Sequence, residues 1–286
     1  MIDGFLNLNK AAGMTSHDAI NLVRKIFQTK KVGHAGTLDP AAVGVLPVAV
    51  GRATKFIEYI ADCDKTYRAE ILFGVKTSTG DLEGEIIFFR EDINLPPEPA
   101  LKAVLERFTG VIEQIPPKHS AIKINGQKAY NLARKNIEFE MPRRLVTISK
   151  IEILRETENS LTLEIDCSKG TYIRTLAEDI GESLNLPATL KFLQRVRVGN
   201  FNLENSATID DLKIGGEKFL LPVESCLKFR SFELPSRRIK AFCNGLPTNI
   251  AAPDEMLKVY AEEKFLGVGK IQSGELRAVK LFDTNF

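Results

Sequence analysis

The order of apolar patterns along the chain constrains the fold more than any other feature. Strand-like runs at Thr66–Phe73 and Glu85–Arg90 follow each other across the turn-rich segment GVKTSTGDLEG. Val146–Leu154 and Ser160–Asp166 form a second pair, joined across ETEN. Helical patterns interrupt these strands irregularly. The larger part of the chain is therefore predicted to be α+β, with a mixed, largely antiparallel sheet rather than a doubly wound one.

Three helices are predicted between the strands. Thr15 and Asp18 have capping-box spacing at the start of a helix expected from about Ser16 to Phe27. Pro99 opens a second helix, whose apolar residues repeat at helical spacing until Gly110 closes it. The third follows SKGTY, and its apolar face consists of Ile173, Leu176, Ala177, Ile180 and Leu184.

The pattern loosens after the strand-like FLQRVRVGNF. Short strands are then expected around LKVYAEE, FLGVGKI and ELRAVKLF. We interpret this part as a small β-rich domain. With 286 residues, the chain is long enough for a large domain over 1–228 and a small one over 229–286.

Composition excludes several classes of protein. Hydrophobic residues make up 44% of the chain, enough for a real core, but no apolar run approaches membrane-spanning length. The N-terminal MIDGFLNLNK lacks the pattern of a signal peptide, so a cytoplasmic protein without a membrane association is expected. The four cysteines are widely spaced and lack a CxxC pair, which argues against a disulfide framework or a zinc site.

Basic and acidic residues are concentrated in different segments of the chain, although the formal net charge is only +2. From Lys118 to Arg144 there are seven basic residues against Glu138 and Glu140, whereas Asp81 to Glu98 holds six acids and one arginine. The seven basic residues are Lys118, Lys123, Lys128, Arg134, Lys135, Arg143 and Arg144. Smaller basic groups include Arg195. Taken singly these are ordinary surface charges, but together they are compatible with an RNA-binding face.

Common cofactor motifs are absent. GVLPVAVGRAT has six residues between its glycines and Arg52 where a phosphate-binding loop needs lysine. GVGKIQSG has the wrong glycine spacing for a dinucleotide fingerprint, and no GxSxG occurs. No cluster of acids and histidines suggests a metal. A reaction without metal or other cofactor is therefore expected.

One acid stands out within GHAGTLDPAAVGVLPVAVGRATK. Asp39 lies among small and apolar residues, and Gly33, Ala35 and Gly36 leave room for a ligand to approach the backbone. A carboxylate held in this way can act as a nucleophile or a base at a sugar carbon. An ionised acid in a pocket needs a partner. Arg174, where a KG turn meets a helix, is a candidate, although an ordinary helix-surface charge is the alternative.

Four segments together carry a family resemblance. GHAGTLDPAAVGVLPVAVGRATK, DKTYRAEILFG, PPKHSAIKINGQKAYNLAR and SKGTYIRTLAEDIGE resemble the TruB-type tRNA pseudouridine synthases, in the same order and with similar separations. The resemblance covers about Gly4 to Gly199. It implies a mixed-sheet catalytic domain followed by a small PUA-like RNA-binding domain. It also implies isomerisation of the uridine at position 55, in the T-loop of tRNA, to pseudouridine without a cofactor.

The resemblance also assigns expected roles. Asp39 would be the catalytic aspartate, Arg174 its ion-pair partner, and Tyr67 the ring that stacks on the flipped uracil and a candidate base at the sugar C2′. His34 would fill the space that the uridine leaves. The other expected substrate-binding positions are Tyr172, Leu193, Lys10, Gly36 and Thr37. The expected RNA contacts are Lys123, Lys128, Arg134 and Arg195. The T-arm stem-loop of tRNA is the expected partner, and the protein is expected to be a monomer.

The mechanism and two rival functions stay open at this stage. Asp39 can attack C1′ to give a sugar ester or add to the uracil ring, and loss of a C2′ proton can give a glycal. One rival function is a non-catalytic RNA-binding or tRNA-folding protein. The other is a glycoside hydrolase that uses Asp39 with Asp62 or Asp64, for which the sequence does not identify the second acid.

Overall fold

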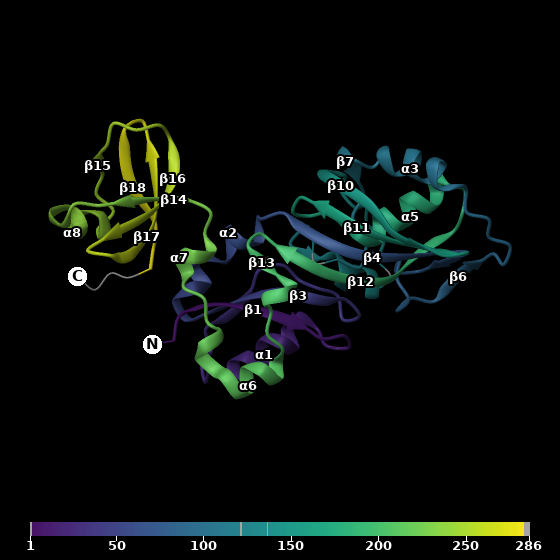
Figure 1. Cartoon of the computed structure of the whole chain (residues 1–286), viewed down its shortest axis with the longest axis horizontal. Coiled ribbons are helices and arrows are strands. Elements are labelled where there is room, and N and C mark those ends of the chain that lie inside the picture. The colour runs from purple at the N-terminus through teal and green to yellow at the C-terminus, as the bar shows by residue number, and fades with distance from the viewer. Residues whose placement is uncertain (1, 121, 136, 283–286) are drawn as a thin grey trace.

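A computed structural model describes residues 2–120, 122–135 and 137–282. Within these ranges the chain forms two larger sheets and two small ribbons. Figure 1 shows the larger sheet with its helices toward one end of the long axis and the second sheet at the other end. The predicted α+β class is thus confirmed.

The larger sheet has nine strands among the described residues and is almost wholly antiparallel. Its main path is β1-β3-β12-β4-β11-β10-β7, with β2 on β3 and β13 on β12. The strands are β1 (Gly4–Lys10), β2 (Val32–His34), β3 (Val43–Val50), β4 (Lys65–Phe73), β7 (Gly110–Gln114), β10 (Arg144–Glu156), β11 (Ser160–Cys167), β12 (Ala188–Val198) and β13 (Phe201–Asn202). Among the described residues of this sheet, only β3 and β12 pair in parallel, over two residue pairs, Gln194↔Val43 and Arg195↔Gly44. This short seam joins β1, β2 and β3 to the rest of the sheet.

The three predicted helices begin at, or within one residue of, the expected positions. Thr15 caps α1 (Ser16–Ile26) and forms the reciprocal capping box with Asp18. The predicted helix after Pro99 is α3 (Glu98–Glu106), but Gly110 begins β7 rather than ending the helix. The other helices are α2 (Ile57–Ala61), α4 (Ala129–Arg134), α5 (Ile173–Ser183), α6 (Ile209–Gly215), α7 (Val223–Cys226) and α8 (Ile239–Cys243). Short 3₁₀ turns cover Gly51–Phe56, Leu203–Asn205, Gly216–Phe219 and Ser236–Arg238.

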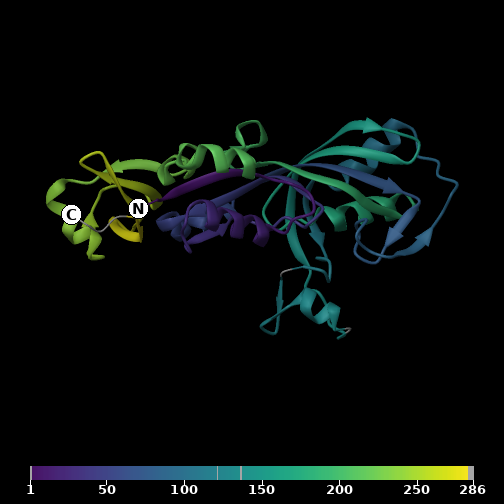
Figure 2. The ribbon, with the colours of Figure 1, turned by 90° about the horizontal axis from the view of Figure 1, so that it is seen from below.

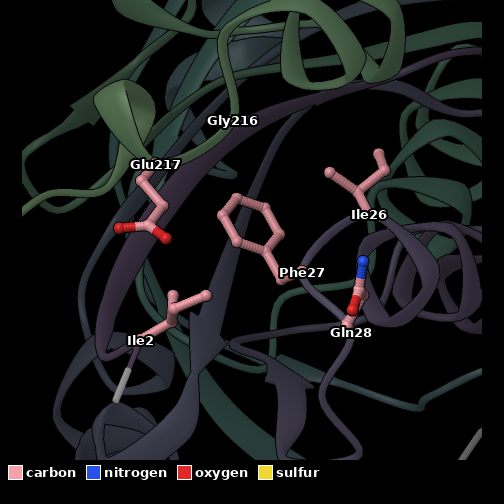
Figure 3. A pocket seen from close by; sticks show the side chains of 6 residues that line it. All are labelled: Ile2, Ile26, Phe27, Gln28, Gly216 and Glu217. Carbon is pink, nitrogen blue, oxygen red and sulfur yellow. The ribbon is translucent and has the colours of Figure 1, made fainter.

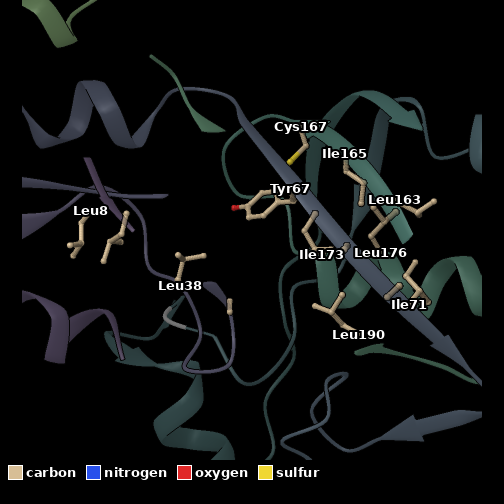
Figure 4. Packing of buried hydrophobic residues seen from close by; sticks show 14 of the residues in the cluster. Leu8, Leu38, Tyr67, Ile71, Leu163, Ile165, Cys167, Ile173, Leu176 and Leu190 are labelled. Atoms are coloured by element: carbon tan, nitrogen blue, oxygen red, sulfur yellow. The ribbon is translucent and has the colours of Figure 1, made fainter. Parts of the chain in front are cut away.

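A continuous apolar core links the sheet to α1 and α5. Ile173, Leu176, Ala177 and Ile180 of α5 are buried in it, as the apolar face predicts. In Figure 4, the Tyr67 hydroxyl points away from Cys167 and toward the side on which Leu38 lies. Tyr67 therefore lies within this core, on the side that faces the loop preceding β3.

The second sheet confirms the β-rich character of the C-terminal part. Its order is β14-β16-β17-β18-β15. The strands are β14 (Arg230–Glu233), β15 (Thr248–Asn249), β16 (Glu255–Ala261), β17 (Lys264–Gln272) and β18 (Glu275–Leu281). Its own core includes Phe242, but Phe265 and Phe282 pack against Phe56 of the larger part, with ring centroids 5.9 and 6.1 Å away. The division after residue 228 stays a proposal.

Two ribbons extend from the larger sheet. β5 (Val75–Thr77) pairs with β6 (Ile86–Phe89), and their connecting turn reaches α5. β8 (Lys123–Ile124) pairs with β9 (Gln127–Lys128) and leads into α4. Figure 2 shows the teal segment with α4 projecting from the side of the body. The basic segment of the sequence therefore stands apart from the sheet.

Gly44 allows the close approach of β12 to β3. We expect Gly44→Ala to lower the free energy of unfolding by about 3 kcal/mol, since it combines overpacking with a strained positive φ. The added methyl carbon would lie 2.3 Å from the Arg195 carbonyl oxygen, and the φ of Gly44 is +100°. Urea unfolding monitored by circular dichroism measures the change.

Gly126→Ala is the matched control. Gly126 also has a positive φ, +84°, but an added methyl there meets nothing within 4 Å. Gly126→Ala should lower the free energy of unfolding by about 1 kcal/mol, from backbone strain alone. Equal losses for the two variants would contradict the tight contact at the seam.

Candidate active site

The loop before β3 presents Asp39 at the edge of the core. Ser16, at the start of α1, fixes the loop because its hydroxyl accepts from the Leu38 N–H at 2.8 Å and donates to the Leu38 carbonyl at 3.0 Å. The Ala42 N–H donates to the Asp39 carbonyl at 3.1 Å. The Asp39 side chain is 41% exposed. A tied backbone thus holds a carboxylate that solvent or a ligand can still reach.

Arg174 comes from the opposite half of the sheet, at the second residue of α5. The buried Gln114 side chain of β7 aligns the helix start: it accepts from the Tyr172 N–H at 2.8 Å and donates to the Tyr172 carbonyl at 3.0 Å. This clamp aims Arg174 inward, and its side chain is 7% exposed. The sequence alternative of a helix-surface charge is wrong.

Arg174 meets Asp39 across the sheet. Its Nε lies 3.1 Å from Oδ2 of Asp39, and its Nη1 lies 3.6 Å from Oδ2 of Asp81. Nη1 also donates to the Thr79 carbonyl at 3.1 Å, and Nη2 to the His119 carbonyl at 2.9 Å. A planar fork with several donors suits such a shared site. Arg174 therefore gathers the Asp39 loop, the β5–β6 turn and the segment before β8.

Asp81 is the acid beside Arg174 that the sequence did not lead us to expect there. It lies in the acidic stretch that the charge count treated as surface, and its side chain is only 13% exposed. Glu83 follows in the same turn, where burial, and after it the charges of Asp81 and Asp39, raise the pKa of Glu83. The sequence feature that could have pointed to Asp81 was the density of acids in a turn between two strands.

Lys10 lies beneath the loop and is fully buried. Its Nζ donates to the carbonyls of Ala11, Met14 and Pro40 at 2.9, 2.7 and 3.1 Å. Burial lowers the pKa of Lys10 to about 8, while the negative charge of Asp39 acts in the opposite direction. In this structure Lys10 supports the backbone next to Asp39 instead of facing a ligand.

Tyr67 and His34 flank the same region. Tyr67 is 8% exposed, and burial raises the pKa of its phenol, with the charge of Arg195 acting against that shift. His34 ends β2, half-buried, and burial lowers the pKa of its imidazole. Both side chains are thus neutral near pH 7 by these shifts. A neutral phenol suits stacking better than proton abstraction.

The remaining predicted substrate positions lie around this centre. Tyr172 caps the start of α5, and the Arg144 guanidinium lies 5.4 Å from the centre of its ring. Leu193 is half-buried on β12, where it pairs with Ala69 of β4. Gly36 and Thr37 precede Asp39 in the loop, and Thr37 is exposed.

The predicted RNA contacts fall into two groups. Lys123, Lys128 and Arg134 are exposed on β8, β9 and α4, and the last two lie 5.5 and 5.8 Å from the centre of the Tyr130 ring. Arg195 is only 1% exposed and donates to backbone carbonyls. That placement does not fit the predicted RNA contact, because a buried guanidinium cannot reach a phosphate at the surface.

Two other features of the described chain do not involve the pair of Asp39 and Arg174. Asp62, one of the acids of the hydrolase alternative, pairs with Lys169 at 2.9 Å instead of with Arg174. A pocket of about 480 Å³ between α1 and the 3₁₀ turn at Gly216 contains none of Asp39, Tyr67 and Arg174 (Figure 3). Among the described residues no group of three or more potential ligands could hold a metal, and no helix is long and apolar enough to span a membrane.

Comparison with known families identifies the fold around this ion pair. The model of the TruB family pseudouridylate synthase N-terminal domain matches residues 24–173, which is just over half of the chain. The chain belongs to the TruB family. The tRNA pseudouridylate synthase B C-terminal domain matches residues 174–228, and the C-terminal domain of pseudouridine synthase II TruB matches 231–282. The resemblance noted in the sequence is confirmed.

Relatives of this TruB-family chain match nearly throughout. A protein named tRNA pseudouridine synthase B from Caldanaerobacter subterraneus subsp. tengcongensis is 41% identical, over 98% of this chain and 99% of its own. One of the same name from Bacillus pumilus is 47% identical, over 94% and 89%. A chain of a solved Cbf5-Nop10-Gar1 complex is 23% identical with a TM-score of 0.75, over 98% and 85%, which supports the fold.

The charge of Asp39 can be measured through Lys10. We expect the Lys10 pKa to be about 8 in the wild type and lower in Asp39→Asn, because Asp39 raises it. A pH titration of the lysine Cε resonance by NMR reports both values. Glu158→Gln, which removes a charge from an exposed turn, should leave the Lys10 pKa unchanged. An unchanged value in Asp39→Asn would mean that Asp39 does not act on Lys10.

Proposed function

We propose that the protein isomerises the uridine at position 55, in the T-loop of tRNA, to pseudouridine, with Asp39 as the catalytic group. The observation that carries the proposal is the ion pair between Asp39 and Arg174. Arg174 is buried and held by two carbonyls, while the carboxylate stays partly open. Membership of the TruB family and the names of its relatives support the same activity.

The Arg174 guanidinium orients the Asp39 carboxylate, with Nε 3.1 Å from Oδ2. An oriented carboxylate serves each of three routes: attack on C1′, addition to the uracil ring, or assistance to loss of a C2′ proton. The isomerisation detaches the base at N1, turns it and rejoins it through C5. No redox change occurs, so the atoms balance without a co-reactant.

The uridine must leave the T-loop stack to reach Asp39. We propose that Tyr67 offers the flipped uracil a face and that Tyr172 and Leu193 wall the pocket. His34, on β2 beside the loop, would fill the vacated space in the RNA. The raised pKa of Tyr67 favours its stacking role over its role as a base at C2′.

The ribbon β8–β9 with α4 is the proposed contact for the T-arm. Lys123, Lys128 and Arg134 are exposed on it, and its base adjoins His119, whose carbonyl binds Arg174. A basic surface joined to the catalytic arginine would bring RNA backbone and target base to one place. The C-terminal sheet is proposed as a PUA-like second contact. The cytoplasmic location stays a prediction.

Tritium release from a T-arm stem-loop carrying [5-³H]uridine tests the function. With EDTA and no cofactor, the wild type should release tritium, because C5 loses its hydrogen when the base rejoins. Asp39→Asn should bind the RNA normally but release at least about 10³-fold more slowly, since a reacting group is lost.

Asp62→Asn is the matched control, because it removes an exposed carboxylate that belongs to the hydrolase alternative. It should keep the wild-type rate. Binding of the stem-loop without tritium release by the wild type would instead favour the non-catalytic RNA-binding function.

The salt dependence of RNA binding tests whether the basic residues of the β8–β9 ribbon and α4 contact RNA phosphates. We expect replacement of Lys123, Lys128 and Arg134 by glutamine to weaken binding and to reduce the slope of log K against log salt by about 2 to 3, since each phosphate contact contributes about 0.9. Fluorescence anisotropy with the labelled stem-loop at several salt concentrations measures both quantities.

A triple variant elsewhere controls for net charge. Lys102, Lys150 and Lys213 are similarly exposed and lie on α3, β10 and α6. Their replacement by glutamine should change the slope by less than about 1. Equal effects of the two triple variants would place the RNA contact on another surface.

A further inference from the structure

The ion pair of the proposed site depends on the seam between β3 and β12. Asp39 precedes β3, and Arg174 belongs to α5, which packs on β12. The two strands share only two residue pairs, Gln194↔Val43 and Arg195↔Gly44. A ladder this short supplies few hydrogen bonds, so other contacts must keep the two halves in place.

Arg195, which belongs to one of these two pairs, provides such contacts. Its Nε donates to the Val45 carbonyl of β3 at 2.7 Å. Its Nη2 and Nη1 donate to the carbonyls of Gly36 and Thr37 at 3.1 and 3.5 Å. One side chain therefore ties β12 both to β3 and to the loop that carries Asp39.

The burial of this charge is costly. Arg195 is 1% exposed, and the hydrogen bonds that it donates to Val45, Gly36 and Thr37 all go to neutral backbone carbonyls. Lys10 and Lys65, buried nearby, are basic as well, and burial, with the charge of Arg195 acting in the same direction, lowers the pKa of each. Apolar residues of similar volume often replace buried charges without loss of stability. A packing role alone therefore does not account for an arginine here.

We propose that Arg195 is a positioning residue, which fixes the loop Gly36–Asp39 against β3 so that the Asp39 carboxylate stays at Arg174. This inference rests on the proposed function and replaces the predicted RNA contact of Arg195. The two roles differ in what they change. A phosphate contact sets affinity and its salt slope, whereas a positioning residue sets the rate at saturating RNA.

The test compares Arg195→Met with Arg195→Lys in the full-length chain. Single-turnover tritium release from the [5-³H]uridine stem-loop gives the rate, and anisotropy gives its Kd. We expect Arg195→Met to lower the rate by at least about 10²-fold, since small misplacement of a reacting group has that effect. The Kd should stay within about threefold. The rate of Arg195→Lys should lie between those of the wild type and Arg195→Met, because an ammonium replaces only part of the hydrogen bonding of the guanidinium.

Arg197→Met is the matched control on the same strand. Arg197 is partly exposed and pairs with Asp166 at 3.0 Å, away from the loop carbonyls. It should keep the wild-type rate. Gly36→Ala changes the loop that Arg195 contacts instead of Arg195 itself. The φ of Gly36 is +96°, and an added methyl would lie 3.4 Å from Arg195 Nη1. It should lower the rate without loss of RNA binding, even where Arg195→Met fails to fold.

Amide hydrogen exchange separates this inference from the proposed function. Exchange at residues 35–42 should speed up in Arg195→Met relative to Arg197→Met, whether or not the protein modifies RNA. Faster exchange with an inactive wild type would overturn the proposed function and retain the positioning role. Unchanged exchange and rate in Arg195→Met, or a weaker Kd with a smaller salt slope at an unchanged rate, would overturn the positioning role.

Discussion

The contact between Arg174 and Asp39 is the interaction on which the arrangement of the larger part depends. It joins a loop from one half of the sheet to a helix on the other half, across a seam of two residue pairs. Loss of Asp39 would leave the buried Arg174 with Asp81, at 3.6 Å, as its neighbouring acid. Arg174, at 7% exposed, also holds the Thr79 and His119 carbonyls. The position of one guanidinium thus determines where three separate segments meet.

Positive charge in this chain is of two physical kinds. Lys10, Lys65 and Arg195 are buried and bind backbone carbonyls, so their charge supports the local backbone. Lys123 and Lys128 are exposed on a ribbon, where their charge faces solvent or a ligand. A count along the sequence adds both kinds together. Only their burial separates the charges that stabilise the site from those available to RNA.

The sequence could predict the features that depend on local spacing. Thr15 and Asp18 marked the start of α1, and the apolar face of α5 was readable from its period. Asp39 and Arg174 were paired by family resemblance, since no local pattern places residues so far apart in contact. Asp81 and the burial of Arg195 escaped, because both depend on how distant strands pair. Strand pairing is set by long-range contacts that a periodic pattern does not contain.

The acids near Arg174 pose a problem for any polyanionic substrate. Asp39, Asp81 and Glu83 lie together in or beside the site, and the raised pKa of Glu83 reflects burial and then this mutual repulsion. The buried cations offset that negative charge from behind the loop. Burial lowers the pKa of Lys10 to about 8, and the charges of Asp39 and Glu83 act against that shift. Acids and buried cations therefore partly offset each other within the protein. Under the proposed function, this arrangement would let the Asp39 carboxylate face a phosphate backbone with less repulsion at long range.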